Sequence, residues 1–317
     1  MHPRRLVVAI AFLSALAGAP AAGAAGISAS FSGSTLSISG DAGGRAVRIV
    51  RDAAGMIHVF LGPNEVTVSG GPATVNSTDV VEEAIQPADD FTIDMTGGPF
   101  APGATHLVFF QGSNFIDRLA IIGNDDPEII GTTRHGITLT GSGDDPEEFI
   151  PFTSLLLDGR GGDDRLLAST QTAPSACTVT SANVTVLGGA GNDHISGTFD
   201  FGNGATSHLN GGPGDDDIVA TECAGQEASA ARTVIVGGSG ADTAIGSNRT
   251  DLGDLIKGGM GTDTIVGNAG PDVLFGGGGA DSIVGIDGTP GNDTLNGQSG
   301  HDSCNGDPGD AIIKCES

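Results

Sequence analysis

Aspartate recurs at one fixed place of a nine-residue pattern in the second half of the chain. From Gly258 the sequence reads GGMGTDTIV, GNAGPDVLF and GGGGADSIV, then, after three inserted residues, GTPGNDTLN and GQSGHDSCN. Each block has Gly at its first and fourth places and Asp at its sixth, and most have an aliphatic residue at the eighth. Carboxylate oxygens in a regular row suit a hard cation such as Ca²⁺, so the chemistry that this spacing predicts is cation binding.

The pattern also predicts the elements that must position these aspartates. Glycines allow positive φ, so the first six residues of a block can turn sharply with their carbonyls pointing inward. The eighth residue then faces the interior from a short strand. Two blocks make one coil, and parallel coils stack about 4.8 Å apart, which brings the carbonyls and carboxylates of successive turns together. A disordered, glycine-rich linker is the alternative, but such a linker requires neither a strict aspartate register nor an aliphatic eighth place.

This repeat resembles the RTX, or haemolysin-type, calcium-binding nonapeptide. The resemblance implies a parallel β-roll that binds several Ca²⁺ ions between stacked coils, through sixth-place aspartates and turn carbonyls, and that folds when calcium binds. Intact copies also begin at Gly188, Gly211 and Gly237, and degenerate copies begin at Gly123, Thr140 and Gly159. We therefore predict a roll over residues 123–317, with degenerate repeats to about residue 187 and regular repeats over residues 188–310.

The expected calcium ligands fall into two rows along the roll. The first row is Asp164, Asp193, Asp216, Asp242, Asp263, Asp281 and Asp302. Their separations of 29, 23, 26, 21, 18 and 21 residues each correspond to one coil or to one coil plus a loop, which places them on one edge. The second row is Asp254, Asp272 and Asp293, on the opposite edge near the C-terminal end. Asp310 falls one place early in its block and is not among the expected ligands.

Residues 1–25 have the parts of a secretory signal peptide. Arg4 and Arg5 form a positive end, residues 6–16 an apolar core, and Ala22-Gly23-Ala24 a small-residue cleavage site. A membrane anchor is the alternative, but the apolar core is too short to span a bilayer. We therefore expect a protein that is secreted to the extracellular space. Many RTX toxins instead leave the cell by an uncleaved C-terminal signal, so the resemblance favours a member of the family that is not a toxin.

Residues 26–122 form a β-rich N-terminal region in this interpretation. Apolar residues alternate with polar ones in short runs about ten residues apart, and Gly and Pro separate the runs. The expected strands cover residues 36–38, 46–50, 57–61, 66–68, 91–95, 107–110 and 119–122. Residues 79–85 could form at most one or two turns of helix. The expected fold is all-β, with an irregular, solenoid-like N-terminal half stacked on a C-terminal β-roll.

Four cysteines in an exported chain suggest disulfide bonds, and four cysteines allow three connectivities. Cys177 and Cys223 both fall in long segments on the edge with fewer motifs, whereas Cys304 and Cys315 flank the last repeat. We favour the pairs 177–223 and 304–315, the second of which would tie down the C-terminus. The alternative, four buried thiols, is uncommon in oxidising compartments.

Composition and missing motifs argue against several functions. Thirteen basic and 39 acidic residues give a net charge of −26, which argues against binding to nucleic acid or insertion into anionic membranes. The chain has no Trp and no Tyr, which weakens sugar recognition by aromatic stacking. It also lacks a His-Glu-x-x-His zinc helix and a Gly-x-Ser-x-Gly elbow. Downstream of the signal-like residues 1–25, the histidines are scattered as His58, His106, His135, His194, His208 and His301, and we expect no catalytic residue.

These observations favour a secreted calcium-binding β-roll protein with a structural or adhesive role and no enzymatic activity. Calcium is the expected cofactor, and a polysaccharide or protein of the cell surface or matrix is the candidate partner. The rival hypothesis is an extracellular enzyme that acts on glycans, with its active site on the N-terminal half and a calcium-binding roll behind it.

Overall fold

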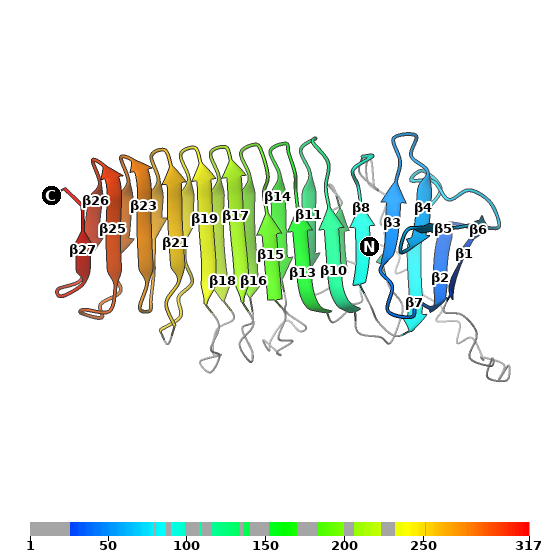
Figure 1. Ribbon diagram of the computed structural model, residues 1–317, viewed down its shortest axis with the longest axis horizontal. Coiled ribbons are helices and arrows are strands. Elements are labelled where there is room, and N and C mark those ends of the chain that lie inside the picture. Colours follow the sequence, from blue (N-terminus) through cyan, green and yellow to red (C-terminus); the bar gives the residue numbers. More distant parts are fainter. Residues whose placement is uncertain are drawn as a thin grey trace, which may run out of the picture.

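The structure is a computed structural model of the 317-residue chain. It describes residues 26–78, 80–86, 90–98, 108–109, 116–133, 136–139, 152–169, 183–199, 206–222, 232–250 and 252–316. Figure 1 shows one elongated stack of strands that runs from the N-terminal part at one end to the C-terminus at the other. All regular elements in the described ranges are β-strands, so the predicted all-β fold is confirmed.

Two parallel sheets form the roll. The long sheet contains β13 (Phe152–Asp158), β15 (Asn183–Leu187), β17 (Ser207–Pro213), β19 (Thr233–Ser239), β21 (Leu255–Met260), β23 (Val273–Gly279), β25 (Thr294–Gly300) and β27 (Ala311–Ile313). The second sheet contains β11 (Ile129–Thr133), β14 (Arg165–Ser169), β16 (His194–Phe199), β18 (Asp217–Glu222), β20 (Thr243–Ile245), β22 (Thr264–Val266), β24 (Ser282–Gly285) and β26 (Ser303–Gly306). The chain alternates between the two sheets, so each pair of successive strands makes one coil.

The apolar residues of the repeat form the core between the sheets. In the second sheet, the register aligns Leu166, Ile195, Ile218, Ala244, Ile265 and Ile283, and each of these side chains is fully buried. In the long sheet, Leu209, Ile235, Ile256, Leu274 and Leu295 make the matching stack. Burying an aliphatic side chain contributes about 1.5–3 kcal/mol. Each nine-residue block therefore supplies one core residue, and each coil supplies one to each sheet.

The long sheet continues without a break into the N-terminal half. Beyond β13 it adds β10 (Ile116–Ile122), β8 (Asp90–Asp94), β3 (Val47–Arg51), β4 (Ile57–Leu61) and β5 (Asn64–Val66). The strands β3, β8, β10 and β13 are parallel, whereas β3, β4 and β5 pair antiparallel. The antiparallel hairpins give this half the irregular character that its sequence predicted.

A separate five-stranded sheet completes the N-terminal end. Its order is β6 (Val68–Ser69), β1 (Gly26–Ser32), β2 (Thr35–Asp41), β7 (Val80–Gln86) and β9 (Val108–Phe109). The sequence allowed at most one or two helical turns over residues 79–85, and residues 80–86 form none, because β7 pairs parallel with β2 along its whole length. Pairing with a neighbouring strand decides the conformation of such a short segment, whatever its own propensity. In the described ranges, no helix has the length and hydrophobicity that a membrane span requires.

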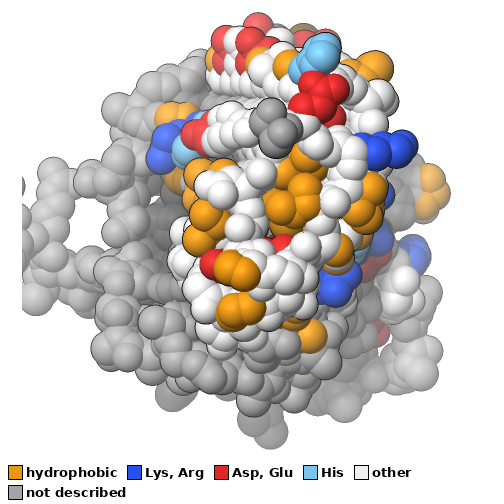
Figure 2. Space-filling model, turned by 90° about the vertical axis from the view of Figure 1, so that its left-hand side faces the viewer, with side chains coloured by type: hydrophobic (Ala, Val, Ile, Leu, Met, Phe, Trp, Pro, Cys, Tyr) orange, Lys and Arg blue, Asp and Glu red, His pale blue; other side chains and the backbone are white. Residues whose placement is uncertain are grey.

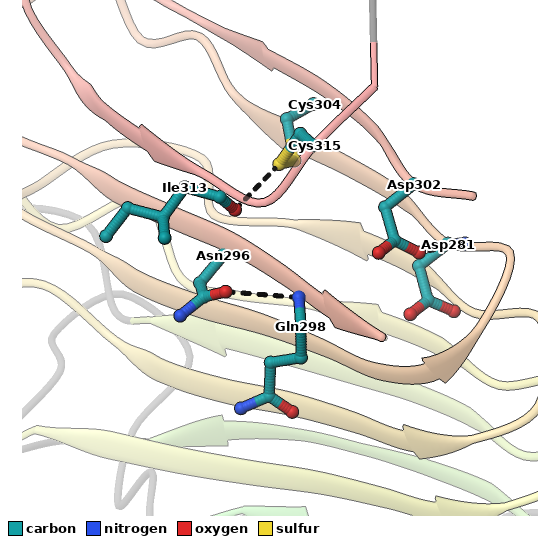
Figure 3. Close-up of a disulfide and its surroundings, with 7 residues drawn as sticks. All are labelled: Asp281, Asn296, Gln298, Asp302, Cys304, Ile313 and Cys315. Carbon is teal, nitrogen blue, oxygen red and sulfur yellow. Dashed lines mark hydrogen bonds between the residues drawn. A yellow bond between two sulfur atoms is a disulfide. The ribbon is translucent and has the colours of Figure 1, made fainter. Parts of the chain in front are cut away.

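The C-terminal end of the roll is closed by a disulfide bond. Cys304 and Cys315 are bonded, with their Cα atoms 5.7 Å apart, which confirms this predicted pair (Figure 3). The predicted pair of Cys177 and Cys223 lies outside the described residues. Figure 2 faces this end and shows hydrophobic side chains near its middle. Ile312 aligns with the core residue Leu295 but is 48% exposed, because no further coil covers it.

Candidate metal centre

The turns between the two sheets form two edges of the roll. We call the turns that lead from the long sheet into the second sheet the first edge, and those that lead back the second edge. Asp164, Asp193, Asp216, Asp242, Asp263, Asp281 and Asp302 lie on the first edge, and Asp254, Asp272 and Asp293 lie on the second. All these side chains are between 0% and 2% exposed. Carboxylates are rarely buried so completely unless they are paired or bind a metal.

Hydrogen bonds join the first-edge aspartates into a ladder. The backbone N–H of each aspartate donates to Oδ1 of the aspartate in the following coil. The donor–acceptor distances are 2.8 Å for 164 to 193, 2.8 Å for 193 to 216, 2.9 Å for 216 to 242, 2.9 Å for 242 to 263, 2.9 Å for 263 to 281 and 3.0 Å for 281 to 302. Figure 3 shows the last two carboxylates, of Asp281 and Asp302, side by side. One oxygen of each carboxylate thus fixes the register between coils.

The other oxygen of these carboxylates has no partner. Oδ2 is buried without a hydrogen bond in Asp164, Asp193, Asp216, Asp242, Asp263, Asp272, Asp281, Asp293 and Asp302. Leaving a buried acceptor unpaired costs about 1–3 kcal/mol, and more when the group is charged. The same unpaired atom therefore recurs in every coil of the regular repeats.

In six of these turns, a backbone carbonyl of the next coil lies on the same side of the first-place glycine as the unpaired oxygen; these are the turns of Asp164, Asp193, Asp242, Asp263, Asp281 and Asp302. At Gly276, the point where a Cβ atom would be built lies closer than 3.0 Å to both Oδ2 of Asp281 and the carbonyl oxygen of Gly297 in the next coil. The first-place glycines Gly188, Gly237 and Gly258 face the same two kinds of atom. Two acceptors that converge without a donor between them repel each other, whereas a hard cation attracts both. This donor set fits Ca²⁺.

Carboxylates alone do not complete such a site. In the described part of the chain, no group of three or more His, Cys, Asp or Glu side chains is arranged to hold a metal ion. Any ion on these edges therefore needs backbone carbonyls among its ligands, as the oxygen-rich coordination of Ca²⁺ allows.

The surroundings raise the pKa of several of these carboxyl groups. Burial raises the pKa of Asp164 and of Asp216 to about 7, partly offset by the backbone hydrogen bond that each accepts, and neighbouring acids add to the increase. On the second edge, burial raises the pKa of Asp272 to about 8. Ionising these groups near neutral pH therefore favours a positive counter-charge at the edge.

Asp254 differs from the other predicted ligands. Its Oδ2 accepts hydrogen bonds from the backbone N–H of Ser247 at 2.6 Å and from the Ser247 hydroxyl at 3.0 Å. Its N–H still donates to Oδ1 of Asp272, at 2.6 Å, so Asp254 takes part in the ladder. With Oδ2 satisfied by the protein, the geometry gives Asp254 a structural position at the head of the second edge.

Asp310 continues the second-edge ladder, although its sequence position excluded it. The turn from Gly306 to Asp310 is one residue shorter than the others, but Asp310 still precedes the core-position residue Ile312 by two places. Its Oδ1 accepts from the N–H of Gly291 at 3.0 Å and of Asp293 at 3.3 Å. Counting back from the apolar residue, instead of forward from the first glycine, would have found it.

Glu128 extends the first edge at its other end. It follows Gly123 by five residues and precedes the buried residue Ile130 by two, as an aspartate does in the regular repeat. Its N–H donates to Oδ1 of Asp164 at 2.8 Å, and its side chain is 4% exposed. The sequence pattern did not identify this position because Glu replaces the sixth-place Asp, and because Asp126 stands at the fourth place, where the repeat has Gly.

The comparisons with known proteins identify the repeat. The model of the RTX calcium-binding nonapeptide repeat matches four copies, at residues 180–200, 229–248, 257–285 and 286–313. No curated protein and no solved structure matches the chain.

Proposed function

Taking as premise that residues 180–313 carry four RTX calcium-binding repeats, we propose that this chain is an exported, calcium-dependent β-roll protein with a structural or adhesive role. The observation that carries the proposal is the row of buried, unpaired Oδ2 atoms, six of which lie together with a backbone carbonyl of the next coil on one side of a first-place glycine. The proposed ligands are Asp164, Asp193, Asp216, Asp242, Asp263, Asp272, Asp281, Asp293 and Asp302, with turn carbonyls. Proteins with such repeats are typically secreted, which agrees with the signal-like residues 1–25.

Calcium binding and folding are coupled in this proposal. Nine unpaired carboxylate oxygens at about 1–3 kcal/mol each cost together about 9–27 kcal/mol, which is as large as or larger than the stability of a typical domain, about 5–15 kcal/mol. A folded roll with ionised aspartates therefore requires the cations, and the free energy of binding becomes free energy of folding.

The proposal does not include catalysis. The histidines that the structure describes with partners are engaged in ion pairs at the surface. His58 lies 2.7 Å from Glu65 and 3.3 Å from Asp52, and His194 lies 2.9 Å from Asp217. Both ring nitrogens of His58 are engaged in this way, which leaves His58 no free nitrogen to act as a general base. An enzyme acting on glycans stays the rival hypothesis, and turnover of a polysaccharide by the purified protein would support it.

Calorimetric titration of the chain lacking residues 1–25 tests the proposal. We expect several Ca²⁺ ions to bind in the millimolar range that extracellular sites commonly show. The far-ultraviolet spectrum is expected to change from largely unfolded to β-rich over the same concentrations, with magnesium far less effective. A spectrum that is the same in chelator and in calcium would contradict the proposal.

The adhesive role needs a separate experiment. We expect a surface or matrix polysaccharide or protein to bind the calcium-loaded chain and to be released by chelator, because the binding surface exists only in the folded roll. A panel of immobilised polysaccharides, probed with calcium-loaded and with chelated protein, measures this directly. Equal retention of both forms would remove the adhesive role while leaving calcium binding intact.

A further inference from the structure

The outer face of the long sheet carries no acidic side chain between β15 and β25. On each of these strands the outward residues alternate with the buried core residues and are half-buried or exposed. The apolar ones are Leu187, Val234, Val236, Leu255, Val273 and Phe275. The others are Thr and Asn residues, His208 and Lys257. In a chain with a net charge of −26, this face therefore combines apolar side chains with an unusual lack of negative charge.

A trench lies in this face, where the strands lead into the first edge. Its volume is about 360 Å³, which is within the range of ligand pockets. Val236, Lys257 and Phe275 are neighbours across three strands and line one side. Gly259 and Gly277, two places further along β21 and β23, line the floor. The surface is hollow here because the glycines have no side chains.

The coil geometry keeps this trench open. A side chain on Gly259 would collide with the carbonyl oxygen of Gly238, and a side chain on Gly277 would collide with that of Gly259. Both glycines also have positive φ, of 125° and 124°. The second place of the repeat thus requires glycine on this side of the roll, and the trench follows from that requirement.

Gln298 closes the trench towards β25. It pairs with Gly277 in the register and occupies the place where the preceding coils have glycine. Its φ of 71° is uncommon for a residue with a side chain. Its N–H donates to Oδ1 of Asn296 at 3.1 Å (Figure 3). A strained backbone conformation therefore places an exposed amide at the end of the trench, and such strain is typical of functional positions.

Lys257 gives the trench a positive charge. Its side chain is exposed, and no ion pair joins it to a residue in the described ranges. Because the surrounding face has no carboxylate, a ligand must bring the counter-charge. The walls formed by Val236 and Phe275 require an apolar group from the same ligand. The fitting occupant is therefore an apolar group with a carboxylate beside it.

A protein segment fits this description better than a sugar or a second copy of the chain. A sugar presents hydroxyl groups around its ring, and the trench has only the side chains of Lys257 and Gln298 to satisfy them. A second copy packed through the same face would bring another Lys257 and no carboxylate. A peptide can place an aliphatic or aromatic side chain next to Asp or Glu in its sequence.

We propose that the trench binds an acidic segment of a protein partner, with an aliphatic or aromatic side chain against Phe275 and a neighbouring carboxylate at Lys257. The proposal rests on the adhesive role proposed above and names the class of partner. It places the contact on the outer face of the long sheet, away from the aspartates of the two edges.

An array of immobilised pentapeptides with blocked ends tests the proposal. The central residue is Leu, Ile, Met, Phe or Trp, and its two neighbours are both Glu, both Ser or both Lys. We expect the calcium-loaded chain to bind the Glu-flanked peptides about two- to fivefold more tightly than the Ser-flanked ones, which is the effect of one exposed ion pair. Phe275→Ala should weaken this binding about tenfold, because it removes the apolar wall.

Reversing the charge of the trench gives the sharper test. Lys257→Glu should invert the order, so that the Lys-flanked peptides bind best. Arg165→Glu is the matched control, since it makes the same change of charge at an exposed position of β14 in the second sheet, and it should keep the order of the wild type. The far-ultraviolet spectrum in calcium checks that each variant is folded. Should Lys257→Glu not fold, Lys257→Gln is expected to remove the preference for Glu over Lys flanks.

The outcomes separate this site from the proposed function. Peptide binding with the same charge preference in the wild type and in Lys257→Glu would overturn the trench as the site. Retention of oligogalacturonate, a sugar chain with a carboxylate on every unit, in place of the peptides would overturn the choice of a protein partner. If the chain folds in calcium and binds neither probe, the site fails and calcium-dependent folding stands. A spectrum unchanged by calcium would instead overturn the proposed function.

Discussion

The two oxygens of a sixth-place aspartate have different roles in this structure. Oδ1 accepts a backbone N–H and fixes the register between coils, as Asp281 does for Asp263 at 2.9 Å. Oδ2 has no donor, and in Asp281 it lies with the carbonyl oxygen of Gly297 on one side of Gly276. An amide in place of the carboxylate keeps the first role and removes the second.

Asp281→Asn is therefore expected to change the chelated and the calcium-loaded protein in opposite directions. In chelator, the amide NH₂ can donate to the nearby carbonyl of Gly297, and we expect a gain of about 1–3 kcal/mol, the cost of an unpaired buried acceptor. In calcium, the midpoint of folding should rise at least tenfold, the smallest effect of losing even an outer ligand. The folded fraction in chelator, from the far-ultraviolet spectrum, measures the first effect, and a calcium titration of folding measures the second.

Asp215→Asn is the control for this experiment. Asp215 is exposed in the preceding place of its turn and accepts the N–H of Ala241 at 2.7 Å, which an asparagine also accepts. It should leave the calcium midpoint unchanged. Equal calcium midpoints for the two variants would show that Oδ2 of Asp281 is not a ligand.

Acidification is expected to stabilise the roll when calcium is absent. The pKa of Asp164 and of Asp216 is raised to about 7 from 3.8, so the metal-free folded state binds more protons than the unfolded state between these values. Its stability is therefore fully present below pH 4 and is lost as the pH rises through 7. Calcium affinity should follow the opposite trend, because ligation needs the ionised form. Circular dichroism in chelator between pH 4 and pH 8 checks the first trend, and a loss of structure on acidification would contradict it.

The sequence predicted individual residues only where motif and register agree. The seven first-row aspartates lie on one edge because each precedes a core position of the second sheet by two places. The strand that follows fixes the side to which such a residue points. Glu128 and Asp310 were missed, since one changes the residue type and the other shortens the turn. The role of Asp254 was also hidden, because its partner Ser247 lies in an insertion whose path depends on the folded turn.

At the scale of the turn, the first place of each block requires glycine for steric reasons. The φ of Gly276 is not positive, so conformational freedom does not explain it. A side chain there would collide with the carboxylate of Asp281 and the carbonyl of Gly297. The space above this glycine is the space that a shared cation would need.

Gly276→Ala and Gly278→Ala test this requirement on the same strand, β23. Gly276→Ala should destabilise the calcium-loaded roll by about 1–3 kcal/mol or more, as overpacking does, and should weaken calcium binding. A Cβ atom on Gly278 meets nothing within 4 Å, and its φ is not positive, so Gly278→Ala should lie within about 1 kcal/mol of the wild type. Equal stabilities for the two variants, measured by thermal melting in calcium, would refute the steric argument.

Strands were predictable where a period defined them. Core residues nine places apart, or twelve where three residues are inserted, located β19 to β26, because each coil repeats the environment of its neighbours. The N-terminal strands β3, β4 and β8 followed from alternation, but β1 and β7 did not. The pairing partner of β7 is β2, about 45 residues earlier in the register, and no local pattern encodes such a contact.

At the scale of the whole molecule, two kinds of interior share one sheet. The N-terminal half is held by aliphatic side chains such as Ile38, Ile49 and Ile93, which are at most 1% exposed. Its buried Asp94 lies 3.6 Å from Arg48 and so has a cationic partner within the protein. The roll instead buries a row of carboxylates whose second oxygen has no partner.

Chelation is therefore expected to unfold the roll and to spare the N-terminal half. In hydrogen exchange, amides of β2, β3 and β4 should stay protected in chelator, whereas amides of β19 to β25 should exchange fast and regain protection in calcium. The strands β10 and β13 join the two halves and should show intermediate protection. Loss of protection at the same calcium concentration in both halves would show that the continuous sheet makes the molecule one cooperative unit.

The disulfide bond at the C-terminal end has a mechanical consequence. Under tension, stacked coils detach from the end of the roll one at a time. Because Cys315 is bonded to Cys304, a pull on the C-terminus bypasses β27 and reaches the chain at β26. The loop over this sequence separation of 11 residues, about 35 Å of extended chain, stays closed under load until the bond is reduced. The load then enters the chain two residues after Asp302. The force that the end of the roll withstands is therefore set by the ion-binding turn that contains Asp302, and not by β27.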